Sequence, residues 1–173
     1  MEHQPARSEY KRSQPRQADL STPRQHGVYL QTKYALPNER PMVSIIIPTR
    51  DQASALKKCV HSIFEKTDYP AYELIVLDNQ SYESEALEFL GELKKRVGVR
   101  VERIDDAFNY SRLNNRGVES SRGSFVALLN NDVEVLHADW LGEMVSRAMQ
   151  PKVAMVGARL WYPNGTIQHD RET

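Results

Sequence analysis

Residues 42–48 read Met-Val-Ser-Ile-Ile-Ile-Pro, and this stretch decides how the rest of the chain is interpreted. Three isoleucines and a valine followed by a proline are typical of a short strand that is buried on both faces. Residues 53–66 carry apolar side chains at helical spacing, and residues 72–77 form a second apolar run. A strand, a helix and a strand in this order predict a parallel βαβ unit.

The same alternation continues along the chain. We expect helices over 84–97, 109–121 and 138–149, and strands over 99–104, 124–129, 153–158 and 159–167, the last with a turn at Pro163-Asn164-Gly165. Strands that alternate with helices of this length predict an α/β fold, a mostly parallel sheet flanked by helices.

The first 40 residues differ from the rest. Residues 1–27 are rich in Gln, Pro, Ser and Arg and lack an apolar face, so we expect a flexible tail. Residues 28–40 are predicted to be an adapter segment, and 41–173 to be the folded domain. Residues 1–40 carry seven basic and four acidic residues, a net charge of +3. A basic arm at an anionic membrane surface is one interpretation, but an upstream linker is favoured.

Composition excludes several classes of protein. Twenty-three basic residues balance 23 acidic ones, which argues against a nucleic-acid partner held by bulk positive charge. The single cysteine, Cys59, excludes an internal disulfide and favours a reducing compartment. No apolar run approaches a membrane span and no secretory signal is visible, so we expect a cytoplasmic protein.

Polar residues follow four of the predicted strands. These residues are Thr49-Arg50-Asp51, Asp78-Asn79, Asp105-Asp106 and Asn130-Asn131-Asp132. Ligands of such sheets bind outside the carboxyl ends of the strands, so we expect these groups to converge on one rim.

The familiar glycine-rich phosphate loops are absent, so a nucleotide needs a metal ion or cationic side chains. Asp132 suits that requirement, because Mg²⁺ or Mn²⁺ takes one or two carboxylates together with phosphate oxygens. By itself, Asn-Asn-Asp after a strand is more often a simple turn.

Four segments that occur in order along the chain favour a ligand site over a simple turn. They are Val-Ser-Ile-Ile-Ile-Pro-Thr-Arg-Asp at 43–51, Leu-Ile-Val-Leu-Asp-Asn at 74–79, Phe-Asn-Tyr-Ser-Arg-Leu-Asn-Asn-Arg-Gly at 108–117 and Leu-Leu-Asn-Asn-Asp at 128–132. Together they resemble the family 2 glycosyltransferases of the GT-A fold. Residues 156–169 are similar to the continuation in bacterial rhamnosyltransferase-like members.

The resemblance implies roles for individual residues. Asp132 would bind Mg²⁺ or Mn²⁺ at the diphosphate of a nucleotide sugar, and Asn131 would lie at the ribose. His169 is a weaker candidate for a second metal ligand, and a surface histidine is favoured. The other residues implied at the nucleotide are Pro48, Thr49, Arg50, Asp51, Asp78, Asn79, Arg112 and Asn115.

The resemblance also implies a reaction. The expected protein is an inverting glycosyltransferase that transfers a sugar to a saccharide or lipid-linked acceptor of a cell-surface polysaccharide, at or near the inner face of the membrane. In the family, the acceptor-binding half and the catalytic base lie beyond the position that corresponds to Thr173, so no catalytic residue is assigned and the domain is expected to be incomplete at its C-terminus. A non-catalytic binding or scaffolding fragment with the same fold is the alternative.

Overall fold

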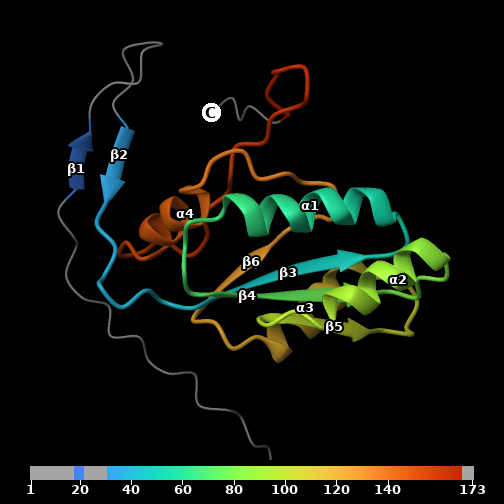
Figure 1. The fold of residues 1–173 in the computed structure, drawn as a ribbon. Helices are drawn as coiled ribbons and strands as arrows, with labels where there is room; N and C mark the ends of the chain where they lie inside the picture. Colours follow the sequence, from blue (N-terminus) through green and yellow to red (C-terminus); the bar gives the residue numbers. More distant parts are fainter. Residues whose placement is uncertain (1–17, 22–30, 169–173) are drawn as a thin grey trace, which may run out of the picture. The chain divides into compact units, whose positions relative to one another are not determined.

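The structure, a computed structural model, describes residues 18–21 and 31–168 (Figure 1). The chain divides into two compact units. The larger contains Pro37–Leu141 and is called the sheet unit; the smaller is drawn from Arg12–Leu36 and Gly142–Thr173. The elements are β1 (Ala18–Ser21), β2 (Gln31–Tyr34), β3 (Val43–Thr49), α1 (Ala53–Lys66), β4 (Tyr72–Asp78), α2 (Ser84–Leu93), β5 (Val99–Arg103), α3 (Tyr110–Ser120), β6 (Phe125–Leu128) and α4 (Trp140–Ala148).

The sheet unit is built on four parallel strands in the order β5-β4-β3-β6. Strand β3 lies between β4 and β6, and all seven of its residues are buried. Its apolar run therefore reflects burial on both faces, as the sequence predicts. The α/β fold with a parallel sheet is confirmed.

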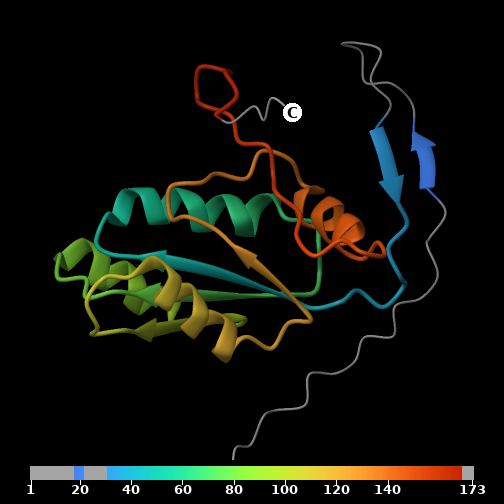
Figure 2. The same cartoon turned by 180° about the vertical axis from the view of Figure 1, so that it is seen from behind.

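Helices cover both faces of this sheet. Chain order runs from β3 through β4 to β5 and then returns to β6 on the far side of β3. With right-handed crossovers, this return places α3 on the face opposite α1 and α2. The two opposed views show α1 and α3 on opposite faces (Figures 1 and 2).

The α3 face has its own apolar core. Ile46, Ile75 and Leu77 of the sheet pack with Ile104 and with Leu113 of α3. Gly117 permits this close approach, because a Cβ atom there would lie 2.6 Å from Cγ2 of Ile46. The packing fixes α3 over the carboxyl-terminal half of β3 and β4.

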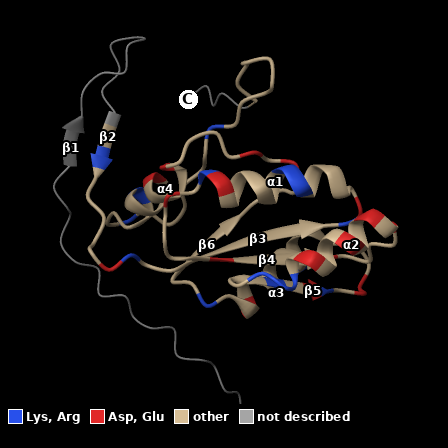
Figure 3. Cartoon of the chain, viewed as in Figure 1, with Lys and Arg blue, Asp and Glu red and all other residues tan. Residues whose placement is uncertain are grey.

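Charged residues of β4 lie only at its two ends (Figure 3). Glu73 is buried near the amino-terminal edge of the sheet, where it accepts hydrogen bonds from the Ser44 hydroxyl at 2.7 Å and the Arg122 N–H at 2.8 Å. Arg100 adds an ion pair at 3.2 Å. This buried network satisfies the carboxylate and ties β3, β4, β5 and the segment before β6 together.

Several element boundaries differ from the sequence predictions. Helix α2 ends at Leu93, because Lys95 and Arg96 donate to the carbonyls three residues earlier and tighten the chain into turns. Gly98 adopts a left-handed φ of 78° directly before β5, five residues after the helix ends, so it is not the residue that terminates α2. Helix α1 has the predicted bounds.

The smaller unit contains an unpredicted pair of strands. β1 and β2 pair antiparallel, with Ala18 opposite Tyr34. Four residues of the expected tail and four of the expected adapter therefore form strands; most of the tail lies outside the described residues. In the same unit, Arg147 of α4 donates to the Thr32 carbonyl at 2.9 Å and pairs with Glu143 at 3.1 Å.

The strand predicted over 153–158 is wrong: these residues form no strand, and Met155 is 86% exposed. The strand predicted over 159–167 is reduced to one antiparallel bridge between Trp161 and Ile167, with the expected turn between them. A short apolar run becomes a strand only where a partner strand pairs with it. Across the described ranges 18–21 and 31–168, no helix is both long enough and apolar enough to cross a bilayer.

Candidate functional site

The carboxyl ends of β3, β4 and β6 bring polar side chains together at one edge of the sheet. Thr49 and Asp78 are paired in register as the last residues of β3 and β4, and the Asn79 N–H donates to the Thr49 carbonyl at 2.8 Å. After β6, the Asn131 amide Nδ2 donates to the Thr49 hydroxyl at 3.1 Å. We call Thr49, Asp78, Asn131 and Asp132 the strand-end site.

Asp78 is almost completely buried and both of its oxygens are engaged. Oδ1 accepts from the Ser81 N–H at 2.9 Å, and Oδ2 accepts from Arg103 Nη1, also at 2.9 Å. Hydrogen bonds to Asp105 and Asp78 raise the pKa of Arg103 further above its usual value. The guanidinium remains part-exposed at the rim, so it offers a fixed positive charge beside the buried carboxylate.

Asp51 organises the neighbouring loop. Its Oδ1 accepts from the N–H groups of Tyr82 and Glu83 at 2.8 and 2.9 Å, and its own N–H donates to the Ser81 hydroxyl at 2.8 Å. Asp51 and Gln52 both have left-handed φ values, 52° and 50°, at the sharp entry into α1. The buried carboxylate thus holds residues 81–83 against the end of β3.

Asn79 points into the protein. It is 1% exposed, and its Nδ2 donates to the carbonyls of Ile104 at 3.1 Å and Asp106 at 2.8 Å. These bonds fasten the loop after β5 to the end of β4. Asn79 therefore acts on the edge of the sheet indirectly, by holding the backbone of the loop after β5 in place.

Four of the predicted site residues differ in their exposure to solvent. Pro48 is buried within β3, whereas Arg50, Arg112 and Asn115 are exposed. Over residues 18–21 and 31–168, the side chains of these three exposed residues form no hydrogen bond or ion pair with the chain. They are free to meet a ligand. His169 lies outside the described residues.

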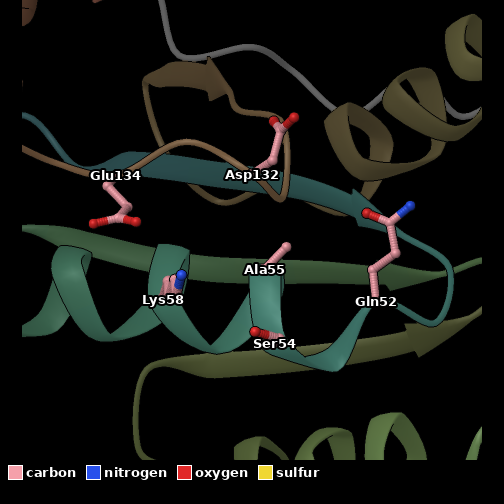
Figure 4. Close-up of a pocket in the computed structure, with 6 residues that line it drawn as sticks. All are labelled: Gln52, Ser54, Ala55, Lys58, Asp132 and Glu134. Atoms are coloured by element: carbon pink, nitrogen blue, oxygen red, sulfur yellow. The ribbon is translucent and has the colours of Figure 1, made fainter. Parts of the chain in front are cut away.

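Asp132 lines an open pocket of about 430 Å³ between the first turns of α1 and the segment 132–134 (Figure 4). Its carboxylate is exposed and forms no ion pair with a Lys, Arg or His side chain within the described ranges. The pocket also presents Lys58 and Glu134; its remaining lining residues are Gln52, Ser54 and Ala55.

Helix α1 holds the loop that carries Asp132. The Val135 N–H donates to the Ser62 hydroxyl at 2.9 Å, and Lys66 Nζ donates to the Val135 carbonyl at 2.8 Å. The Cys59 thiol lies 3.6 Å from the Asn130 carbonyl, and desolvation by burial raises its pKa to about 12. Cys59 is therefore a packed, uncharged neighbour of the loop.

The chemistry of these side chains fits a divalent cation that takes most of its ligands from phosphate and water. Asp132 supplies a free carboxylate. The described residues contain no group of three or more His, Cys, Asp or Glu side chains able to hold a metal by themselves. One carboxylate together with substrate phosphates is a common arrangement for Mg²⁺.

Three residues that bond to Asp78 or to the neighbouring Asn130 were not predicted: Ser81, Arg103 and Tyr110. Arg103 is the last residue of the observed β5, but the predicted strand ran on to residue 104, so reading the residues that follow it gave Asp105 and Asp106 instead. Ser81 follows Asp78 by three residues, the spacing of a side-chain-capped turn. Tyr110, whose hydroxyl donates to Asn130 Oδ1 at 3.2 Å, has no such signal in the sequence.

Comparison with known proteins agrees with this architecture. The family model described as glycosyl transferase family 2 matches residues 44–172. The chain is 53% identical over 130 residues to the uncharacterized protein y4gI of Sinorhizobium fredii, covering 75% of this chain and 14% of that protein. It is 37% identical over 131 residues to the O-antigen biosynthesis protein RfbC of Myxococcus xanthus, covering 75% of this chain and 10% of that protein.

Among solved structures, the chain is similar to the mannosyltransferase PcManGT of Pyrobaculum calidifontis, which was determined in complex with GDP-Man and Mn²⁺. The TM-score is 0.62 at 21% identity, over 75% of this chain and 38% of that one. At this low sequence identity, the structural similarity supports a shared fold and nothing further. The chain spans a seventh or less of y4gI and RfbC.

Proposed function

The chain belongs to glycosyltransferase family 2, and we propose that its sheet unit binds the nucleotide-diphosphate sugar from which a glycosyl group is transferred. The observation that carries this proposal is the meeting of three strand ends, where Thr49 is joined to Asn79 by a backbone hydrogen bond and to Asn131 by a side-chain bond. Asp78 and Asp132 place carboxylates at the same edge. Such an edge is where ligands of open α/β sheets bind.

In this proposal the nucleoside lies over the ends of β3 and β4. Each oxygen of Asp78 accepts one hydrogen bond within the protein and keeps a second lone pair, with which the carboxylate accepts from a base N–H. Arg50, Arg112 and Asn115 supply exposed polar groups around the base and ribose, and Asn131 meets the ribose. Pro48 and Thr49 form the floor. Asp51 and Asn79 act as positioning residues, because their side chains hold the loops at 81–83 and 104–106.

A Mg²⁺ or Mn²⁺ ion would be held by Asp132 at the diphosphate. There it would supply positive charge to a leaving group that becomes more negative as its bond to the sugar breaks. The exposed carboxylate beside an open pocket supports this placement.

The complete protein would transfer the sugar with inversion. An acceptor hydroxyl oxygen forms a bond to the anomeric carbon, the bond from that carbon to the diphosphate oxygen breaks, and a base takes the hydroxyl proton. None of the described residues is assigned as this base. The name of the relative RfbC supports a polysaccharide acceptor, saccharide or lipid-linked, and we place the reaction in the cytoplasm at the membrane surface.

Calorimetric titration tests the donor site. UDP, dTDP and GDP are each titrated with and without Mn²⁺ into the wild-type chain, Asp132→Ala and the control Glu88→Ala, which removes an exposed carboxylate from α2. We expect Mn²⁺-dependent binding of one nucleotide, lost in Asp132→Ala and retained in Glu88→Ala.

Failure of all three nucleotides to bind the folded wild-type chain would overturn the proposal and favour a non-catalytic scaffold. Binding that Asp132→Ala leaves unchanged would overturn the metal assignment.

A further inference from the structure

The two asparagines that precede Asp132 are held in opposite senses by hydroxyl groups from different elements. Tyr110 at the start of α3 donates to Oδ1 of Asn130 at 3.2 Å. Asn131 instead donates its Nδ2 to the Thr49 hydroxyl at 3.1 Å. The uncommitted group of Asn130 is therefore its N–H₂ donor, and that of Asn131 is its carbonyl acceptor.

The Tyr110 end of the Tyr110–Asn130 bond is anchored. The Asn109 side chain caps α3 by accepting from the Arg112 N–H at 2.9 Å, and Asn114 Nδ2 donates to the Tyr110 carbonyl at 3.0 Å. The backbone of Tyr110 is thereby held while its ring remains 46% exposed.

The Asn130 end is anchored as well. The Cys59 thiol lies at 3.6 Å from the Asn130 carbonyl. Val135 donates its N–H to Ser62 and accepts from Lys66 at its carbonyl, and these bonds hold the following residues along α1. The amide of Asn130 is therefore oriented by the fold before any ligand arrives.

A hydroxyl group accepts one hydrogen bond and donates another, so an amide N–H beside an amide carbonyl is a complementary surface for a sugar edge. We propose that Tyr110 is a positioning residue that keeps the N–H₂ of Asn130 turned toward hydroxyl groups of the bound donor. This inference rests on the proposed function. The hydroxyl groups belong either to the ribose or to the transferred sugar.

A double-mutant cycle on the full chain tests this role. Affinities for UDP, GDP, UDP-glucose and GDP-mannose are measured with Mn²⁺ for the wild type, Tyr110→Phe, Asn130→Ala and the double variant. Asn130→Ala and Tyr110→Phe are each expected to weaken binding by about 3- to 10-fold, the worth of one hydrogen bond. Because Tyr110 acts through Asn130, the double variant is expected to be no weaker than Asn130→Ala alone.

Further arms identify the hydroxyl groups. If they belong to the ribose, Tyr110→Phe weakens UDP or GDP as much as the sugar nucleotide, and the 2′- or 3′-deoxy nucleotide is insensitive to the substitution. If they belong to the transferred sugar, only UDP-glucose or GDP-mannose is weakened. The control Tyr72→Phe, at the opposite edge of the sheet, should bind like the wild type.

A ligand-free readout separates this inference from the proposed function. In a ¹⁵N-labelled chain, the side-chain amide signals that disappear in Asn130→Ala should move in Tyr110→Phe and stay in place in Tyr72→Phe. Unmoved Asn130 signals, additive losses in the cycle, or unchanged affinities in Tyr110→Phe would each overturn the role of Tyr110. A wild-type chain that binds no nucleotide would overturn the proposed function and with it the recognition role, although the amide signals would still report the contact.

Discussion

The Arg103 guanidinium donates a 2.9 Å hydrogen bond to Asp78, joining the end of β5 to the end of β4. The same Nη1 donates to the Ser81 carbonyl at 2.8 Å, and Nε donates to Asp105 at 2.9 Å. Arg103 therefore fixes the direction of the buried carboxylate and the loop that follows it. Its side chain remains 41% exposed at this edge of the sheet.

Replacement of Arg103 by alanine should weaken nucleotide binding by roughly tenfold, because Asp78 loses its charged hydrogen-bond donor and can turn away from the ligand. Arg103→Lys should recover only part of the affinity, since an ammonium group lacks the two-sided geometry of a guanidinium. The measurement is the dissociation constant of the preferred nucleotide in the presence of Mn²⁺. The matched control is Arg122→Ala, an exposed arginine near the amino-terminal edge; equal losses in both arginine variants would contradict the assignment.

Loss of the Asp51 carboxylate should loosen residues 81–83. Asp51→Ala removes the acceptor of two backbone N–H groups and leaves a non-glycine residue at a φ of 52°. We expect a loss of about 1–3 kcal/mol in the free energy of unfolding, measured by urea denaturation, and faster proteolytic cleavage at the loop. Asp51→Asn retains an acceptor oxygen and tolerates the left-handed conformation, so it should lose less. An alanine variant as stable as the asparagine variant would argue against the hydrogen-bonding role.

Two glycines on different helices should respond to alanine in opposite directions. At Gly117 the added Cβ meets Ile46 at 2.6 Å and Leu77 at 3.1 Å, so Gly117→Ala should destabilise the protein by about 1–3 kcal/mol. At Gly91 in α2 nothing lies within 4 Å of the added Cβ, so Gly91→Ala should stabilise the protein by about 0.5–1 kcal/mol. Urea denaturation of both variants checks the pair. A neutral Gly117→Ala would mean that α3 does not pack on β3 as closely as described.

The buried thiol of Cys59 should make stability depend on pH in the alkaline range. Burial raises its pKa from 9.0 to about 12 because desolvation disfavours the thiolate. The unfolded chain releases this proton near pH 9 and the folded chain near pH 12, so the contribution is complete below pH 9 and is lost as pH rises toward 12.

The control for this effect is Cys59→Ala, which has no thiol to ionise. The difference in unfolding free energy between the wild type and Cys59→Ala should be constant from pH 7 to 8.5. From pH 9 upward, the wild type should lose stability relative to Cys59→Ala. Thiol reagents should react with the native chain far more slowly than with the urea-unfolded chain. Rapid modification of the native protein would contradict the burial of Cys59.

Helices and strands of the sheet unit followed from local pattern. The Ile-rich run of β3 and the helical spacing in α1 were sufficient, because each element carries an apolar face whose period matches its geometry. The same reasoning failed for residues 153–158, where an apolar composition is not matched by a partner strand. It also missed β1 and β2, since four-residue polar strands carry no periodic signal that outweighs their turn-forming and polar neighbours.

For the strand-end site, the order of polar residues along the chain was enough to place Thr49, Asp78, Asn131 and Asp132 at one edge, because parallel strands necessarily end on the same side. The orientation of each side chain was not accessible in this way. Asp51 and Asn79 bind the backbone of distant loops, whereas Arg50, Arg112 and Asn115 stay exposed. The contact of Tyr110 with Asn130 joins residues 20 positions apart. Hydrogen bonds between loops depend on how strands and helices pack in three dimensions. Only the tertiary structure therefore decides which polar groups form hydrogen bonds within the protein and which remain available to a ligand.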